Sequence, residues 1–229
     1  MNTIHATAVI GDGVVLGERN VIGPHAVLLG PLEVGDDNWI GPGVTIGTPP
    51  EVRGVPHGAQ WDAPAGSGVV IGSRNVLREH VLVHQGWAGR TVVGDDCFIM
   101  NKVYVAHDTV LGDRVTLAST VTMGGHVRVG AGANIGMGAV VHQRRVVAPG
   151  AMVGMGAVVT RDVPPFSLVY GTPARIQGAN VVGMSRAGVP DDAVEAVRAA
   201  YARGDVPAPH DAPDVLLDHF LWWEKETAS

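Results

Sequence analysis

An apolar residue recurs at every sixth position through most of this 229-residue chain, and no other feature restricts the possible fold so strongly. The repeat starts at Ile4, breaks after Ile46 and after Val83, and otherwise continues without exception to Val159. A period of six matches neither the 3.6-residue turn of an α-helix nor the two-residue alternation of a strand. It matches a short strand and a turn, repeated, with one branched side chain per repeat pointing inward. Three repeats would close a triangular coil of 18 residues, and successive coils would stack about 4.8 Å apart.

The composition agrees with a long column of aliphatic side chains. Hydrophobic residues make up 46% of the chain but aromatic residues only 5%, so small branched side chains must fill the core. Many glycines directly follow an inward position, as at Gly94 and Gly112, and we expect these to be corners with positive φ. The pattern resembles the hexapeptide-repeat family, and this resemblance implies an all-β solenoid wound as a left-handed parallel β-helix.

The two breaks in the repeat predict two loop insertions on one face of the prism. They follow repeats 8 and 11, which share a face because every third repeat stacks. We therefore expect a β-helix over residues 1–165 with insertions at about 48–69 and 84–92, and an irregular closing segment over 166–189. Apolar residues at helical spacing predict a short C-terminal α-helical region over 190–229, with helices at 191–203, where Asp191 is the N-cap, and at about 214–225.

Charge, cysteine content and hydropathy exclude several classes of function. The net charge of −6 argues against a nucleic-acid-binding surface, so no nucleic-acid partner is expected. A single cysteine, Cys97, cannot form an internal disulfide. The N-terminus lacks the pattern of a signal peptide, and no apolar run is long enough to span a membrane. We expect a cytoplasmic protein with no membrane span.

Three of the ten histidines fall on the same face as the insertions. His107, His126 and His142 lie in repeats 14, 17 and 20, and the 18-residue coil stacks Gly125 and then Gln143 on His107. Coil spacing brings the three imidazoles within about 10 Å of one another, and Gly125 leaves space and a bare backbone amide beside His107. Such a cluster suits either a zinc site or a general base. Since the His-x4-His pair of the carbonic anhydrases built on this helix is missing, we predict no metal ligands.

Local strings on this face resemble one family more closely. Residues 99–108 (IMNKVYVAHD), 124–127 (GGHV), 141–143 (VHQ), 162–166 (DVPPF) and 180–186 (NVVGMSR) resemble the acyl-carrier-protein-dependent UDP-N-acetylglucosamine O-acyltransferases of lipid A synthesis. The resemblance implies that His107 is the general base, that Asp108 orients it, and that the Gly125 amide stabilises the tetrahedral oxyanion.

The same resemblance implies roles for further residues, a pair of substrates and an oligomer. The positions that match substrate contacts in the family are His126, His142, Gln143, Asn180 and Arg186. Met155 matches the position that limits acyl-chain length, where a bulky residue implies a short chain. The donor would be a phosphopantetheine thioester on acyl carrier protein, a substrate rather than a cofactor, and no cofactor is expected. The acceptor would resemble a sugar nucleotide, and the protein would be a homotrimer.

Two departures from the family pattern leave the acceptor open. Tyr104 stands where the family has a second histidine, and the family's short acceptor loop is replaced by residues 48–68, which lack its Gln-Asp pair. Asp62 and Arg53 are candidate substitutes. We predict an acyltransferase that acylates a hydroxyl or amine of a UDP-N-acetylglucosamine-like sugar nucleotide. The alternatives are a transferase that uses acyl-CoA and another small acceptor, a degenerate β-helix that only binds ligands, and a zinc enzyme like the carbonic anhydrases.

Overall fold

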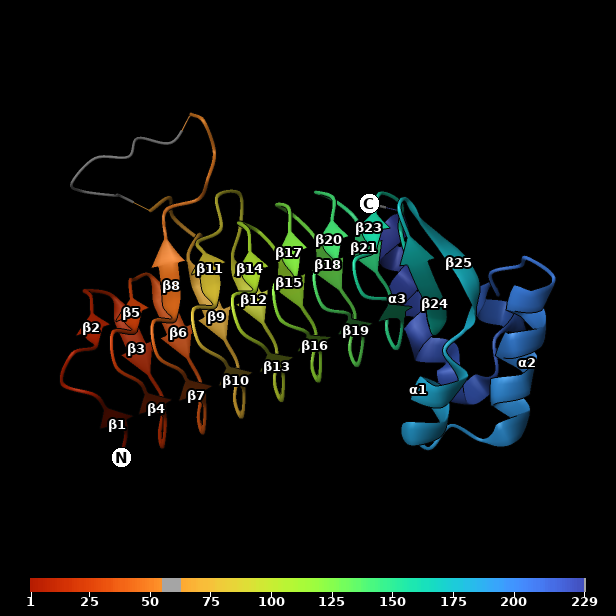
Figure 1. Ribbon diagram of the computed structural model, residues 1–229, viewed down its shortest axis with the longest axis horizontal. Helices are drawn as coiled ribbons and strands as arrows, with labels where there is room; N and C mark the ends of the chain where they lie inside the picture. The colour runs from red at the N-terminus through yellow and green to blue at the C-terminus, as the bar shows by residue number, and fades with distance from the viewer. Residues whose placement is uncertain (55–62, 229) are drawn as a thin grey trace.

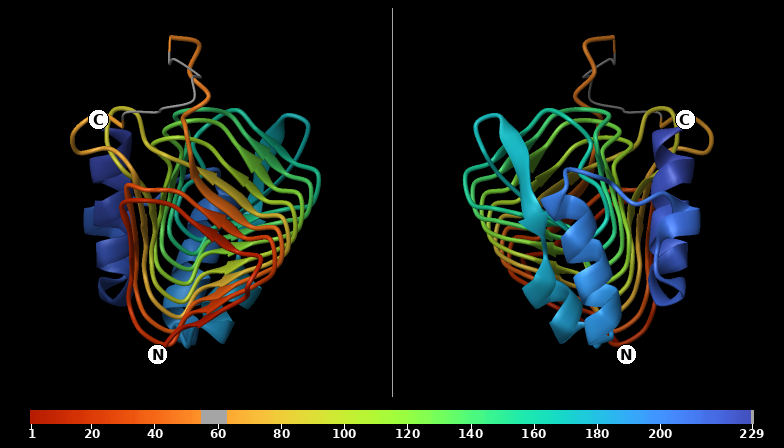
Figure 2. Two further views of the ribbon diagram at one scale, coloured as in Figure 1. Left: turned by 90° about the vertical axis from the view of Figure 1, so that its left-hand side faces the viewer. Right: turned by 90° about the vertical axis from the view of Figure 1, so that its right-hand side faces the viewer.

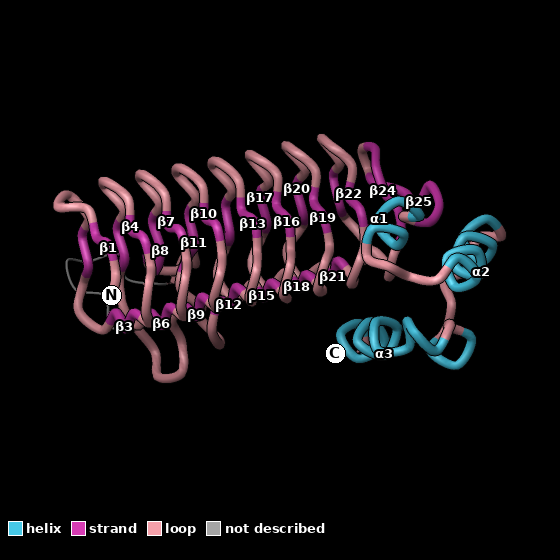
Figure 3. The backbone as a smooth tube through the Cα atoms, turned by 90° about the horizontal axis from the view of Figure 1, so that it is seen from below, coloured by secondary structure: helices cyan, strands magenta, loops and turns pink. Residues whose placement is uncertain are grey.

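Three parallel sheets form the faces of a triangular prism, which the computed structural model describes over residues 1–54 and 63–228 (Figures 1 and 2). Each coil contributes one strand to each sheet in turn, and the coils stack along the long axis of the molecule (Figure 3). The first sheet contains β1 (Thr3–Ile4), β4 (Val21–Ile22), β7 (Trp39–Ile40), β10 (Val76–Leu77), β13 (Phe98–Ile99), β16 (Thr116–Leu117), β19 (Asn134–Ile135), β22 (Met152–Val153), β24 (Ser167–Gly171) and β25 (Ala174–Ala179).

The other two sheets have the same construction. The second sheet contains β2 (Val9–Ile10), β5 (Val27–Leu28), β8 (Thr45–Thr48), β11 (Leu82–His84), β14 (Tyr104–Val105), β17 (Thr122–Met123), β20 (Val140–Val141) and β23 (Val158–Val159). The third sheet contains β3 (Val14–Leu16), β6 (Leu32–Val34), β9 (Val69–Ile71), β12 (Thr91–Val93), β15 (Val110–Leu111), β18 (Arg128–Val129) and β21 (Val146–Val147). The predicted parallel β-helix of hexapeptide repeats is therefore confirmed.

The inward column forms the core that the repeat predicted. Val105 pairs with Met123 and Met123 with Val141, each 18 residues along the chain. From Ile22 to Val159 the inward residues are at most 4% exposed, whereas Ile4 in the first coil is 44% exposed because no coil covers it. Each buried aliphatic side chain contributes roughly 2 kcal/mol, so the column can stabilise a fold with few aromatic residues.

The prediction that glycines directly after the inward position have positive φ is wrong for all of them except Gly47, whose φ is 89°. The left-handed backbone occurs two residues later, as at Arg114 with φ of 57°, and not at Gly112. Gly112 is required for a different reason: a Cβ there would lie 2.9 Å from the backbone nitrogen of Ala131 in the next coil. Close approach of stacked coils, rather than backbone freedom, therefore explains these glycines.

Both insertions leave the same corner, between the second and the third sheet. The longer one joins β8 to β9 and the shorter one joins β11 to β12, and the longer one projects above the prism in Figure 1. Their ends meet, because Gly68 and Gly86 form an isolated antiparallel bridge. The structure thus gathers both loops at the edge where His107 lies, after β14.

The C-terminal part differs in two ways from the expectation. The segment expected to be irregular contains the antiparallel hairpin β24–β25, in which β24 extends the first sheet by pairing with β22, and α1 (Val181–Arg186). The helix α2 (Asp191–Ala202) begins after Pro190, so Asp191 is its first residue and not its N-cap. The two short helices η1 (Pro209–Asp211) and η2 (Asp214–Leu216) precede α3 (Leu217–Thr227). Within the described residues, no helix is both long enough and apolar enough to cross a membrane.

Candidate active site

The site is built from equivalent turn positions of successive coils. His107 and Asp108 form the turn after β14, Gly125 and His126 the turn after β17, and Gln143 lies in the turn after β20. Because β14, β17 and β20 are neighbours in one sheet, the stacking of coils brings these turns together. The His126 amide donates to the His107 carbonyl at 3.0 Å, which locks the two turns in register.

His107 and Asp108 form a hydrogen-bonded dyad. Nδ1 of His107 lies 2.7 Å from Oδ2 of Asp108, whose side chain is only 6% exposed. An ionised carboxylate can only accept hydrogen bonds, so the imidazole proton must be on Nδ1 and the lone pair on Nε2. The dyad therefore leaves the lone pair of Nε2 free to accept a proton.

The surroundings of Asp108 keep it ionised. Burial alone would raise the pKa of this carboxyl, because a charge is poorly solvated in the protein. Hydrogen bonds from His107 and from the backbone amides of Trp87 and Gly89 outweigh burial, and the pKa of Asp108 lies below its ordinary value of 3.8. The carboxylate is thus charged at neutral pH, as the tautomer of His107 requires.

The imidazole of His126 faces the dyad without a hydrogen bond to it. Its ring meets that of His107 edge to face, with centroids 5.1 Å apart, and its Nε2 lies 3.7 Å from Oδ2 of Asp108. Burial is the main cause that lowers the pKa of His126 below 6.5, and the Arg144 cation adds to this while the Asp108 carboxylate opposes it. A neutral imidazole at this place can donate to or accept from a bound polar ligand.

Gly125 lies against the basic nitrogen of His107. A Cβ at this position would lie 2.5 Å from Nε2, so only a glycine leaves the imidazole in place. Its carbonyl accepts from the Arg144 amide at 2.9 Å, whereas its own N–H makes no hydrogen bond within the described part of the chain. A free amide beside a base is the arrangement that an oxyanion donor needs.

The same cluster has the spacing of a metal site. His107, Asp108 and His126 each offer one potential metal-ligating atom, and these three atoms lie within 4.8 Å of one another. His107 and Asp108 are already hydrogen-bonded to each other. His142, which the sequence placed in the same cluster, is not part of this group. Nδ1 of His142 lies instead 3.0 Å from the Gln143 carbonyl oxygen, on an exposed turn. The hydrogen bonding of these groups therefore favours a general base over a metal site.

Within this chain the candidate residues do not all lie together. His142 and Gln143 lie exposed one coil beyond Gly125, at the same corner. Met155 follows β22, at the corner between the first and second sheets, and is 76% exposed, so it is not a core residue. Asn180 caps α1, accepting from the Gly183 amide at 3.0 Å, and Arg186 lies in the last turn of that helix. Figure 1 places α1 beyond the last coil and near the opposite edge of the prism.

The long insertion is held at its start by a buried histidine. Nδ1 of His84 lies 2.9 Å from the carbonyl oxygen of Pro49 and 3.1 Å from Oγ1 of Thr48, and its ring lies 5.3 Å from that of Tyr104. Tyr104 thus lines the base of this loop. Of the two substitutes considered for the missing acceptor contacts, Arg53 is exposed on the turn at residues 53–54. Asp62 lies outside the described residues.

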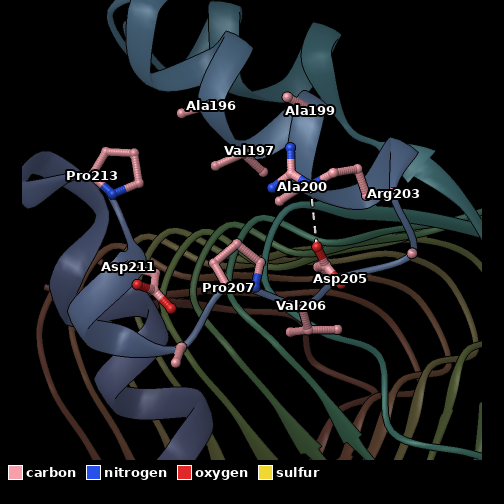
Figure 4. A pocket seen from close by; sticks show the side chains of 12 residues that line it. Ala196, Val197, Ala199, Ala200, Arg203, Asp205, Val206, Pro207, Asp211 and Pro213 are labelled. Carbon is pink, nitrogen blue, oxygen red and sulfur yellow. Dashed lines mark hydrogen bonds and ion pairs between the residues drawn. The ribbon is translucent and has the colours of Figure 1, made fainter.

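Several cavities lie away from this corner. One of about 730 Å³ separates α2 from residues 203–213 and is lined mainly by alanine, valine and proline beside the Arg203–Asp205 ion pair (Figure 4). Another, of about 620 Å³, is lined by Arg114, Arg186 and His219 together with apolar residues. Neither of these two cavities is lined by His107 or Asp108.

Sequence reasoning missed the segment that holds the dyad. The amides of residues 87–89 and the hydroxyl of Thr91 bind Asp108, and all of them belong to the short insertion or its end. The position of that insertion on the histidine face was the available signal. Backbone amides themselves leave no mark in a sequence.

Comparisons with known proteins agree with this geometry. Residues 162–203 match the model of the second domain of UDP-N-acetylglucosamine O-acyltransferase, and residues 90–125 match the bacterial transferase hexapeptide model. The chain is 35% identical to the acyl-[acyl-carrier-protein]–UDP-N-acetylglucosamine O-acyltransferase of Thermodesulfovibrio yellowstonii, over 88% of this chain and 83% of that one. It is 38% identical to the Paraburkholderia xenovorans enzyme, over 88% and 82%.

Solved structures give the same result. The chain resembles the UDP-N-acetylglucosamine acyltransferase from Campylobacter jejuni with a TM-score of 0.73 and 29% identity, covering 95% of this chain and 88% of that one. It resembles the Arabidopsis enzyme with a TM-score of 0.69 and 27% identity, covering 87% and 80%. Both likenesses cover most of this chain.

Proposed function

We propose, from the premise that this chain belongs to the acyl-[acyl-carrier-protein]–UDP-N-acetylglucosamine O-acyltransferase family, that it transfers an acyl group from acyl carrier protein to a hydroxyl of a UDP-N-acetylglucosamine-like sugar nucleotide. The single observation that carries the proposal is the dyad of His107 and Asp108 facing the free amide of Gly125. Relatives that share 35% and 38% identity over most of their length carry this activity in their names.

In this mechanism His107 accepts the proton of the acceptor hydroxyl on Nε2 while the oxygen attacks the thioester carbonyl. The Gly125 amide donates to the oxyanion of the tetrahedral intermediate. The carbon–sulfur bond then breaks, and the imidazolium returns the proton to the departing thiolate of phosphopantetheine. Asp108 stays ionised throughout, and it stabilises the imidazolium in the manner of the carboxylate in hydrolase triads.

The acceptor subsite differs from the family pattern at Tyr104 as well as in the long insertion. Tyr104 stands where a histidine is expected, and its ring packs on His84 at the base of the long insertion. We assign the binding of the acceptor and the acyl-phosphopantetheine to His126, His142, Gln143, Asn180 and Arg186. In our proposal Met155 limits the length of the acyl chain.

A homotrimer completes the site in this proposal. Asn180 caps α1 and Arg186 lies in its last turn, whereas His107 follows β14 at another corner of the same protomer. Substrate contacts from both regions therefore require α1 of a neighbouring subunit beside the dyad. The partner's α1 would then bind the part of the substrate that extends away from the reacting hydroxyl.

The test is mass spectrometry of products formed from a panel of acyl donors and UDP-sugars. We expect an ester of a UDP-N-acetylglucosamine-like acceptor with acyl carrier protein as donor. His107→Ala should lower kcat/KM by about 10²- to 10⁴-fold, because general-base assistance is worth that much, with unchanged thermal unfolding.

His210→Ala is the matched control, since His210 is an exposed histidine on η1, and it should retain full activity. Full activity of His107→Ala would remove His107 from the role of base. Product formation from acyl-CoA alone would identify a different donor, and binding of the sugar nucleotide without any product would indicate a binding protein.

A further inference from the structure

Three consecutive backbone amides converge on the carboxylate of Asp108. The N–H groups of Ala88 and Gly89 donate to Oδ1 at 2.9 and 2.8 Å, and that of Trp87 lies 3.1 Å from both carboxylate oxygens. Such a row of amides forms a concave site for an anion, with fixed partial positive charges directed at the oxygens. The orientation of the carboxylate is therefore set by the loop and not by Asp108 alone.

A buried hydroxyl holds the main chain of the same residue. The Asp108 amide donates to Oγ1 of Thr91 at 2.9 Å, and Thr91 is 0% exposed. Asp108 has a left-handed backbone, with φ of 59°, as do the equivalent turn residues Lys102 and His126 of neighbouring coils. The bond from Thr91 supports this backbone conformation, and through it the direction in which the side chain leaves the turn.

The loop that supplies the amides is itself closed at its base. The Gly68 carbonyl accepts from the amides of Gly86 and Thr91, both at 3.1 Å. A Cβ at Gly68 would lie 2.6 Å from the Pro31 carbonyl oxygen, and its φ is +107°, so this position requires glycine. One carbonyl of the long insertion thus joins the two ends of residues 86–91.

We propose that Thr91 is a positioning residue for the transfer reaction, and that residues 86–91 form a frame whose amides and hydroxyl hold Asp108 in line with His107. This inference rests on the proposed function, in which His107 is the base. A carboxylate held in advance needs no reorganisation when the imidazole becomes charged. The short insertion is then part of the catalytic machinery and not only a surface loop.

The primary test is Thr91→Val, which removes the acceptor oxygen and keeps the branched shape. We expect kcat to fall about tenfold or more, with KM for donor and acceptor within about twofold, because misplacing a catalytic group chiefly weakens the transition state. Thr91→Ser restores the oxygen and should restore kcat. Thr91→Ala also removes the oxygen, with a smaller side chain, and replaces Thr91→Val as the test if the valine variant does not fold.

Thr109 provides a matched control one coil further along. It is the same residue type, 18 residues after Thr91, and it is also 0% exposed. Its Oγ1 has no hydrogen-bond partner among residues 1–54 and 63–228. Thr109→Val should therefore leave kcat unchanged and leave thermal stability unchanged or slightly raised, since an unpaired buried hydroxyl contributes nothing favourable.

A double-mutant cycle separates positioning from a general loss of structure. If Thr91 acts through Asp108, Thr91→Val should lower kcat about tenfold in the wild type but less than about twofold in an Asp108→Asn background. Residual rates would be measured as product accumulated over hours. Equal losses in the two backgrounds, or an unchanged kcat in both Thr91→Val and Thr91→Ala, would overturn the proposal.

The two proposals fail in different ways. If His107→Ala is fully active, the proposed base is wrong whatever the Thr91 variants do. If His107→Ala is inactive but the Thr91 and Asp108 substitutions add independently, the reaction stands and the frame does not. A higher KM with unchanged kcat in the Thr91 variants would assign Thr91 to substrate binding and would likewise contradict positioning.

Discussion

At the scale of single residues, the position of the proton on the His107 imidazole decides what this corner of the prism can do. The buried Asp108 carboxylate accepts from Nδ1 of His107, which leaves Nε2 free to act as a base next to Gly125. The 18-residue coil predicts from sequence that His107 and Gly125 are neighbours. It does not predict that three amides of residues 87–89 keep the carboxylate charged, because backbone donors are the same in every sequence.

Gly125→Ala tests the space beside the base. The added Cβ would lie 2.5 Å from Nε2 of His107, so the imidazole must move. A displacement of this size is expected to lower kcat about 10²-fold. Thermal unfolding should change little, because the clash is with the far end of a partly exposed side chain. Steady-state kinetics and differential scanning fluorimetry provide the two measurements.

Thr122→Ala is the control for this substitution. Thr122 lies three residues earlier in the same coil, in β17, and its side chain is exposed. It should retain wild-type kinetics. Wild-type kinetics in Gly125→Ala would mean that Gly125 is not needed to place the imidazole.

At the scale of the elements, stacked asparagines connect successive coils along one corner. The Asn20 side-chain oxygen accepts from the backbone N–H of Asn38 at 2.9 Å, and the Asn38 side-chain oxygen accepts from the backbone N–H of Asn75 at 2.9 Å. Nδ2 of the Asn38 side chain also donates to the Gly72 carbonyl at 2.9 Å. Beyond Asn75 the position is occupied by Cys97, whose thiol lies 3.3 Å from the Gly112 carbonyl oxygen. The ladder satisfies polar backbone groups that the turns leave buried.

Asn38→Ala is expected to destabilise the fold by about 1–3 kcal/mol. It leaves the buried Asn75 amide without its acceptor, and an unsatisfied buried donor costs about that much. Urea unfolding followed by circular dichroism measures the change. Asn134→Ala, at an exposed position of β19, should stay within about 0.5 kcal/mol of the wild type. Equal stability of the two variants would show that the ladder contributes nothing.

At the scale of the whole molecule, the candidate residues divide into two groups. His107 and its neighbours lie at the corner that carries both insertions, and Arg186 lies on α1, beyond the last coil (Figure 1). The proposed trimer would bring α1 of one subunit to the dyad of the next. Within one subunit α1 cannot lie beside the dyad, because the stacked coils between them hold α1 beyond the last coil.

Subunit mixing tests this arrangement. His107→Ala and Arg186→Ala should each be weakly active alone, since every site in either homotrimer lacks one group. Co-expressed subunits should form mixed trimers in which some sites combine an intact His107 with an intact Arg186 from the neighbour, and activity should return to at least several times that of either parent. Activity no higher than the sum of the parents would contradict a shared site, as would full activity of Arg186→Ala.

The six-residue repeat by itself determined the stacked coils, the core and the corner where the histidines meet, because one apolar residue per strand and turn is buried only when successive coils stack. The tertiary structure alone decided three other features. They are the closing hairpin β24–β25, the close coil-to-coil approach that requires Gly112, and the amides of residues 86–91 around Asp108. Each depends on where backbone atoms of distant segments meet, and side-chain patterns carry no record of backbone donors and acceptors.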